Sequence, residues 1–224
     1  MSNPAKRPVG QQSRREAIIA AAEAVFADHG YDRARLEDVA RKVGIQRPSL
    51  LYHFHDKATL YGAVLDAILE DLVGRYARVL AGKGSTGERL ERTVDEWLRF
   101  TTERPALLRI MLREMADGVS EHSRRFARRA RALMTSMSDV VAAGQADHSL
   151  RQVDAGHMLM IIAGASTFLT LGGSVLNTTA TERFPALADR EQHRQLLLTM
   201  LRKLLGTSGP RPTLRELQSK AVGG

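Results

Sequence analysis

The chain has 224 residues, of which 43% are hydrophobic and 26% charged, so it can bury one large helical core or two smaller cores that share an interface. Its formal net charge of +8 suits DNA, because neutralising phosphates releases condensed counterions, and it suits an anionic membrane surface equally well. The chain contains no cysteine, which excludes disulfides, thiolate nucleophiles, iron–sulfur clusters and cysteine-type zinc sites.

No segment of the sequence has the pattern of a signal peptide or a membrane span. Lys6 and Arg7 are basic, but Pro8 and Gly10 follow where a signal peptide needs an apolar run. The longest nearly apolar stretch, Met158 to Leu171, is too short to cross a bilayer, which takes about 20 residues. We therefore expect a cytoplasmic protein with no membrane partner.

Helical periodicity covers most of the chain, whereas strand signals are nearly absent. Ser13 and Glu16 form a capping box ahead of an apolar face, which predicts a first helix that Gly30 ends. Gly44 stops a short second helix, and Pro48 suits the first turn of a third. The start of the chain is therefore expected to hold three helices.

Beyond the third helix, the pattern predicts a long helix over about Lys57 to Leu80 and then a flexible, glycine-rich loop over residues 82–87. Further helices are expected at about 86–103, 105–115, 120–145, 153–176 and 189–205. We divide the all-α chain into a disordered arm (1–12), a helix-turn-helix domain (13–56), a larger helical domain (57–206) and a mostly disordered tail (207–224).

The segment from about Leu36 to His53 has the pattern of a helix-turn-helix, in which a tight turn joins two short helices. Ala40 is small where the helices approach, Gly44 allows the turn, and Ile45 fills the wedge between them. The second helix, Arg47 to His53, is short for a core element but long enough to enter a major groove. On spacing alone, a surface hairpin with solvated polar residues is an equally good interpretation.

The run from Ala20 to Leu65 carries a series of motifs in a fixed order. They are Phe26-Ala27-Asp28-His29-Gly30-Tyr31, Asp38-Val39-Ala40, Gly44-Ile45 and Ser49-Leu50-Leu51-Tyr52-His53-Phe54-His55-Asp56-Lys57-Ala58-Thr59-Leu60. In this run the chain resembles the TetR family of bacterial repressors, whose signature has F-x-x-x-G-Y, an I/V-A pair, G-V/I and Y-x-x-F-x-x-K-x-x-L. Ala34 and Arg35 stand where the family usually has the Ser or Thr that caps the second helix, Leu51 replaces the commoner Tyr, and Pro48 replaces a small residue.

The resemblance implies an all-α protein with an N-terminal three-helix DNA-binding head, followed by a larger helical domain for ligand binding and dimerisation. It places Phe26, Leu50 and Phe54 in the core of the head. The DNA-contacting residues that it implies face bases and adjacent sugar-phosphate (Gln46, Arg47, Ser49, Leu51) or phosphates (Tyr52, His53, Lys57), and Arg35 is a further phosphate candidate.

The larger domain carries seven of the eight methionines, flexible side chains that suit a pocket for an irregular apolar ligand. His157, on an otherwise apolar helix, is the best polar candidate in such a pocket. The candidate effector contacts are Trp97, Phe100, Leu108, Met111, Met115, Met134, Met137, His157 and Phe168. For each of them, ordinary packing in a helical core is the favoured alternative.

The last two predicted helices favour a homodimer. The helix over 153–176 is apolar almost all round, and the helix over 189–205 carries a broad leucine stripe, so two copies can bury both in a four-helix bundle. The expected interface residues are Met160, Gly164, Phe168, Leu197, Leu201 and Leu204. The alternative is a self-contained monomer core.

A run of arginines from Arg124 to Arg131 is interpreted as a solvated helix face, with a second nucleic-acid contact or an anionic-ligand rim as the alternatives. The sequence has no P-loop order at Gly82 to Gly87, no G-x-S-x-G and no H-x-x-x-H, so we expect no catalytic residues, metal or cofactor.

The function predicted is a DNA-binding transcriptional repressor, released from an inverted-repeat operator by a small, largely apolar effector. The alternatives are an activator with the same fold, a helical ligand-binding protein without DNA activity, and a basic scaffold or membrane-surface protein.

Overall fold

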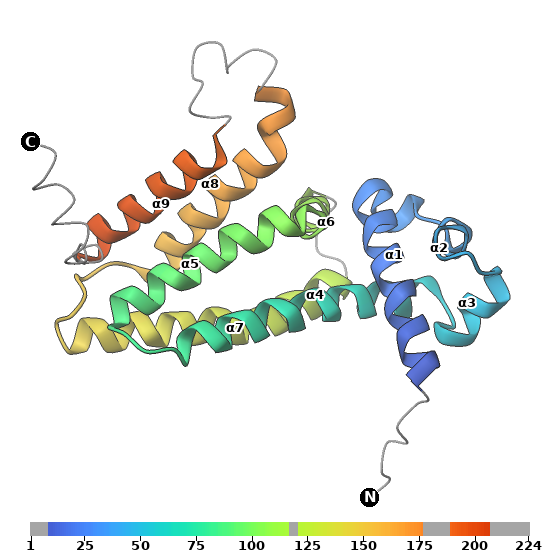
Figure 1. Ribbon diagram of the computed structural model, residues 1–224, viewed down its shortest axis with the longest axis horizontal. Helices are drawn as coiled ribbons and strands as arrows, with labels where there is room; N and C mark the ends of the chain where they lie inside the picture. Colours follow the sequence, from blue (N-terminus) through green and yellow to red (C-terminus); the bar gives the residue numbers. More distant parts are fainter. Residues whose placement is uncertain (1–8, 117–120, 177–188, 207–224) are drawn as a thin grey trace, which may run out of the picture. The chain divides into compact units, whose positions relative to one another are not determined.

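The computed structural model describes residues 9–116, 121–176 and 189–206, and within these ranges the chain consists of helices and short connections (Figure 1). The helices are α1 (Val9–Arg33), α2 (Leu36–Val43), α3 (Arg47–His53), α4 (Lys57–Leu80), α5 (Thr86–Glu103), α6 (Pro105–Ala116), α7 (Glu121–Ala146), α8 (Ala155–Leu176) and α9 (Arg190–Leu205). This confirms the all-α prediction and places most helix ends within a few residues of those expected. The predicted tail, 207–224, lies outside the described residues.

The first helix begins earlier than the sequence suggested. It starts at Val9, so Ser13 lies inside α1 and does not cap it, and the predicted capping box is wrong. Of the expected arm, residues 9–12 form the first turn of α1, and the remainder lies outside the described residues. Gly30 does interrupt the helix, with φ 73° and ψ 174°, a backbone conformation that only glycine adopts without strain.

The turn between α2 and α3 is built on Gly44, which has φ 73° and ψ 35°. Its left-handed conformation lets the backbone N–H of Ile45 reach the carbonyl oxygen of Ala40 at 3.0 Å, which closes the end of α2. Leu36 and Val39 are buried beneath this corner. The helix-turn-helix therefore has the bounds that the sequence predicted.

Two compact units divide the chain, and the division crosses α4, α5 and α7. The first unit, Met1–Gly74 with Thr101–Leu133, holds α1 to α3, most of α4, α6 and the start of α7. The second, Arg75–Phe100 with Met134–Gly224, holds most of α5, the rest of α7, α8 and α9. This division by packing differs from the functional boundary at residue 57, which stays a prediction.

The core of the first unit is built around the end of α1. Phe26 is buried and meets Tyr61 of α4 edge to face, with ring centroids 4.8 Å apart. Leu50 of α3 and Phe54, just after it, are also buried, which confirms the three core residues expected from the sequence. Burying a side chain of this size contributes about 1.5–3 kcal/mol, so α3 is anchored by a few large contacts.

In the second unit, α9 is attached to α5 by two arginines. Arg194 pairs with Asp95, and Arg202 pairs with Glu91 at 2.8 Å, with the carboxylates largely buried. The same unit buries apolar side chains from α5, α7, α8 and α9, namely Leu90, Val94, Leu98, Met137, Val141, Met158, Ile162, Leu197, Leu201 and Leu205. No helix among the described residues is both long and apolar enough to cross a membrane.

Candidate nucleic-acid interface

The helix α3 turns one side to the protein and the other to solvent. Leu50 is buried against the core, whereas Tyr52 keeps 76% of its surface exposed. Gln46, Arg47 and Ser49 are exposed as well. This short helix therefore presents a hydroxyl, an amide, a guanidinium and a phenol together, the groups that bond base edges and phosphates.

Arg47 makes a weak, exposed ion pair. Its guanidinium lies 3.1 Å from Glu37 of α2, and both side chains are about half exposed. Such exposed pairs contribute about 0–1 kcal/mol, so a guanine edge or a phosphate can replace Glu37 at little cost.

The remaining predicted DNA contacts differ in how exposed their side chains are. Arg35 is exposed at the N-cap position of α2 and makes no side-chain cap there, as its departure from the usual Ser or Thr indicated. Leu51 and His53 are half-buried, and the rings of Tyr52 and His53 meet edge to face at 5.5 Å. Both half-buried residues lie beside the exposed face of α3 and not at its centre.

Lys57 has partners inside the first unit. Its Nζ donates hydrogen bonds to the carbonyl oxygens of Asp32, at 3.0 Å, and Ala34, at 3.3 Å. It also lies 4.7 Å from the centre of the Tyr31 ring. The phosphate contact expected of Lys57 stays a prediction, and the structure adds a second role, that of joining the start of α4 to the C-terminal end of α1 and to Ala34 just after it.

Asp56 caps the N-terminus of α4, a role that the sequence analysis did not assign. Its Oδ1 accepts the backbone N–H of Thr59 at 2.7 Å, and this bond and a further one from the Thr59 side chain hold the pKa of Asp56 below its ordinary value. His55 lies 2.8 Å from the same carboxylate. An Asp directly before the first residue of a predicted helix was the available signal.

Two family models match this chain. The model of bacterial regulatory proteins, tetR family, matches residues 18–64, which include α2 and α3, and the tetracyclin repressor-like C-terminal domain matches residues 83–171. The chain belongs to the TetR family of bacterial regulatory proteins. DNA-binding transcriptional regulation is the function class of this family.

Two curated relatives illustrate the family. The chain is 32% identical over 104 residues to the HTH-type transcriptional activator FasR of Mycolicibacterium smegmatis, a match covering 42% of this chain and 48% of that protein. It is 31% identical over 91 residues to the HTH-type transcriptional repressor KstR2 of Rhodococcus jostii, covering 41% and 45%. The match thus spans about half the length of these relatives.

A solved structure extends the likeness in fold to nearly the whole chain. A TetR transcriptional regulator from Chloroflexus aurantiacus has a TM-score of 0.70 to this chain at 22% identity. The superposition covers 88% of this chain and 98% of that one, so the arrangement of helices is the TetR fold.

The TetR-family effector contacts predicted from the sequence do not gather around one described cavity. Phe100 and Met137 are buried core residues of the second unit, and the indole of Trp97 donates a hydrogen bond to Ser166 at 2.8 Å. Leu108, which is buried, and Met111, which is half-buried, belong to the first unit. The Met115 side chain lies outside the described residues.

Three of these candidates are exposed. His157, the best polar candidate of the sequence for such a pocket, lies in the first turn of α8, pairs with Asp154 at 2.9 Å and keeps 87% of its side chain exposed, which agrees with the favoured alternative of a structural residue. Met134 and Phe168 are exposed too. An open pocket of about 600 Å³ in the first unit is lined by other residues of α1, α4 and α7, among them Arg15 and Glu70.

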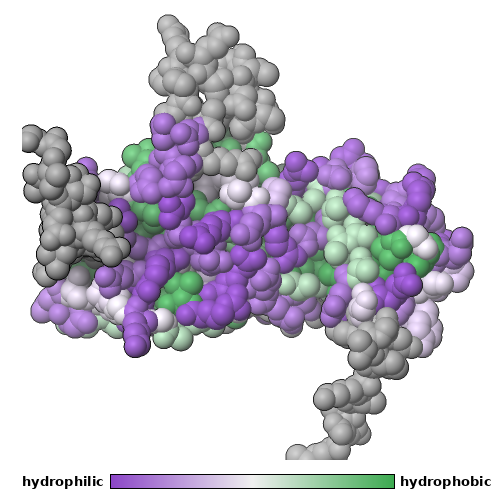
Figure 2. Space-filling view, viewed as in Figure 1, coloured by the Kyte–Doolittle hydropathy of each residue, from purple (hydrophilic) through white to green (hydrophobic). Residues whose placement is uncertain are grey.

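Most of the exposed large apolar side chains of the second unit lie on α8 and α9, where Figure 2 shows hydrophobic residues at the surface. Met160 and Phe168 are 67% and 63% exposed, and the space above Gly164 is open. On α9, the exposed apolar side chains are Leu196, Met200 and Leu204, and on α8 they include Ile161. We call Met160, Ile161, Gly164, Phe168, Leu196, Met200 and Leu204 the α8–α9 apolar face.

Two of the predicted interface residues are not on this face. Leu197 and Leu201 are buried within the subunit, against the core of the second unit. The exposed stripe of α9 runs through Leu196, Met200 and Leu204. The leucine-rich sequence of α9 offers apolar residues at neighbouring positions, which is why the inward and outward stripes were not separated.

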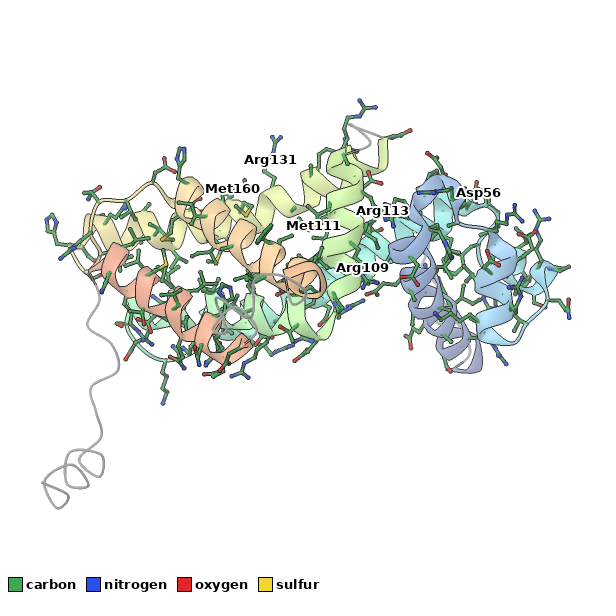
Figure 3. The ribbon with its side chains drawn as sticks, turned by 90° about the horizontal axis from the view of Figure 1, so that it is seen from above. Asp56, Arg109, Met111, Arg113, Arg131 and Met160 are labelled. Carbon is green, nitrogen blue, oxygen red and sulfur yellow. The ribbon has the colours of Figure 1, made fainter. Side chains whose placement is uncertain are left out.

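The arginine run at the start of α7 has exposed members. Arg124, Arg128 and Arg131 are exposed, and Figure 3 shows Arg131 pointing away from the helices. The side chains of Arg125 and Arg129 lie outside the described residues. The exposed arginines fit the solvated-face interpretation. Among the described residues, no group of three or more His, Cys, Asp or Glu side chains is placed to hold a metal ion.

Proposed function

We propose that this protein is a homodimeric transcriptional repressor that binds an inverted-repeat operator with α3 and is released by a small-molecule effector. The observation that carries the proposal is the two-sided packing of α3, with Leu50 buried and Tyr52 exposed. A helix held in this way fits a major groove about 12 Å wide without disturbing the core that supports it.

The contacts proposed within one half-site follow from exposure. Gln46, Arg47 and Ser49 read base edges, with Arg47 exchanging Glu37 for guanine. Leu51 packs against the adjacent bases and sugars, and the phosphate contacts come from Arg35, Tyr52, His53 and Lys57. Base discrimination therefore lies at the start of α3, and the phosphate contacts around it fix the register of the protein on DNA.

The proposed dimer forms through the α8–α9 apolar face. Exposing apolar side chains as large as Met160 and Phe168 to water costs free energy. In a dimer with a two-fold axis, the α8–α9 apolar face of one subunit covers the same face of the other. Two heads related by this axis read half-sites about 34–36 Å apart or a multiple of that distance.

The effector is proposed to be a largely apolar small molecule that binds among residues matched by the repressor-like C-terminal model, 83–171. To release DNA it must bind the non-operator conformation more tightly, with a coupling of about 1–3 kcal/mol. Binding to DNA makes the cytoplasm the proposed location.

Activation is the second candidate, because FasR, one relative, is named an activator, whereas KstR2 is named a repressor. A reporter gene behind the selected operator separates the two. Repression predicts that deleting the regulator raises reporter output, and activation predicts that the same deletion lowers it.

The DNA-binding proposal is tested by selecting bound fragments from random duplexes and measuring affinity by fluorescence anisotropy at several salt concentrations. Tyr52→Ala and Arg47→Ala are expected to weaken binding. Arg99→Ala, which removes an exposed arginine that pairs with Asp95 in the second unit, is the control. If both α3 variants bind as tightly as the wild type, α3 is not the recognition helix.

A further inference from the structure

Arg104, between α5 and α6, bonds two other helices of the first unit at once. Its Nε donates to Glu23 Oε1 of α1 at 3.2 Å, and its Nη2 bonds the other oxygen of the same carboxylate. Its Nη1 donates to Asp71 Oδ2 of α4 at 2.9 Å. One guanidinium therefore joins α1, α4 and the start of α6.

This arrangement is well shielded from solvent. The side chains of Arg104 and Glu23 are 25% and 12% exposed, and Asp71 is partly buried. Burial by itself lowers the pKa of Arg104, but the hydrogen bonds and charges of Glu23 and Asp71 outweigh burial and raise it. A two-pronged bond between arginine and carboxylate also fixes an angle, which a single point charge does not.

Other contacts continue along the same side of α6. The Nη2 of Arg113 donates to the carbonyl oxygen of Asp28 at 2.9 Å, just before α1 is interrupted at Gly30. Arg109 reaches the Asp28 side chain at 3.2 Å, but that pair is exposed. Figure 3 shows Arg109 and Arg113 extending from α6 toward α1.

We propose that Arg104 is a positioning residue, which holds α1 and the head built on it at one angle to α4 and α6 and so sets the operator spacing that the dimer accepts. The proposal rests on the proposed function, because spacing has meaning only for a dimer on an inverted repeat. Base reading by α3 does not involve Arg104. Its loss loosens the angle of the head and leaves the reading surface intact.

The test uses the full-length protein and three kinds of duplex: the selected operator, operators with one base pair added or removed between half-sites, and an isolated half-site. With Arg104→Gln, affinity for the selected operator is expected to fall about tenfold. The preference for its spacing over the altered spacings is expected to shrink by a similar factor. Affinity for the isolated half-site stays within about twofold, since α3 is untouched.

Two milder variants keep the proposal testable if Arg104→Gln does not fold. Asp71→Asn removes the charge of the α4 partner and keeps Glu23 for Arg104, and Arg104→Lys keeps the charge without the planar fork. Both are expected to lose part of the spacing preference. Arg109→Gln is the matched control, because it removes an exposed pair between α6 and α1 and is expected to bind like the wild type.

Circular dichroism and thermal melts identify the variants that are folded at the temperature of the binding assay. The proposal is overturned if the folded variants keep the wild-type spacing preference. It is equally overturned if half-site and full-site affinities fall by the same factor, which is the sign of a purely structural role. Failure of the wild type to bind any of the duplexes is a different result, because it removes the proposed function itself.

Discussion

The ammonium of Lys57 donates a hydrogen bond to the carbonyl oxygen of Asp32, at 3.0 Å. Lys57 is the first residue of α4, and Asp32 lies in the turn that follows the break of α1 at Gly30. The same ammonium lies against the ring of Tyr31. A side chain at the start of α4 therefore stabilises the corner of the chain that leads into α2.

These contacts of Lys57 lead to a prediction for Lys57→Met. Losing two hydrogen bonds and a cation–π contact is expected to lower the free energy of unfolding by about 1–3 kcal/mol, measured by urea denaturation. DNA affinity falls alike for all sequences. If Lys57 also contacts a phosphate, the slope of log affinity against log salt flattens by about one unit.

The salt slope decides between the two roles of Lys57. An unchanged slope with reduced stability assigns Lys57 to the fold alone. A Lys57→Met variant with the free energy of unfolding and the DNA affinity of the wild type contradicts both roles.

Arg47→Ala is predicted to relax base preference at one position of each half-site, at a cost of about 1–3 kcal/mol for the preferred base. The reason is that Arg47 gives up only an exposed pair with Glu37 to reach the groove. Affinities are measured on operators that carry each of the four bases at each position.

The control for Arg47 is Arg41→Ala on α2, which also removes an exposed arginine paired with a carboxylate, Asp38. It is expected to leave the base preferences unchanged. Equal loss of affinity for all bases in Arg47→Ala makes the residue a phosphate contact and refutes its role in reading bases.

The sequence predicted the approximate bounds of the helix-turn-helix, about Leu36 to His53, because its turn and the start of α3 are marked by local chemistry. Gly44 is required for the left-handed turn, and Pro48 fits the first turn of α3. The bond from Lys57 to Asp32 could not be predicted in the same way, since it depends on how two helices far apart in the sequence pack together. The Arg104 cluster has the same origin.

Elsewhere the sequence pattern was compatible with more than one arrangement. Ser13 and Glu16 match a capping box, but the residues before them also form helix, so the helix extends through the match to Val9. His157 follows Asp154 by one turn, and that local pairing holds it at the surface although the rest of α8 is apolar. Periodicity gives the apolar residues of a helix but not the neighbour that each one faces.

The α8–α9 apolar face yields a prediction about assembly. Phe168→Glu places a charge on a side chain that is 63% exposed in the single chain, so the subunit is expected to fold normally. If two copies cover this face, the buried charge disrupts the dimer. Analytical ultracentrifugation is expected to show a monomer at micromolar concentration, with weaker binding to the full operator.

Leu201→Ala is the comparison for Phe168→Glu, because Leu201 was expected at the interface and is buried inside the subunit. It is expected to lower the free energy of unfolding by about 2–5 kcal/mol through the cavity it leaves. If the Phe168→Glu variant is still a dimer, the α8–α9 apolar face is not the dimer interface.

His193 of α9 gives the protein a predicted sensitivity to mild acid. Its Nε2 is buried and has no hydrogen-bond partner among the described residues, and burial lowers the pKa of its imidazole. The unfolded chain, with an ordinary histidine pKa of about 6.5, therefore takes up a proton more readily than the folded chain does. The stability that neutral His193 contributes is fully present above that pH and is lost as the pH falls through the folded pKa. Urea denaturation at pH 7.5 and pH 5 is expected to show a smaller drop for His193→Gln than for the wild type, and parallel drops contradict the assignment, because the other histidines are common to both chains.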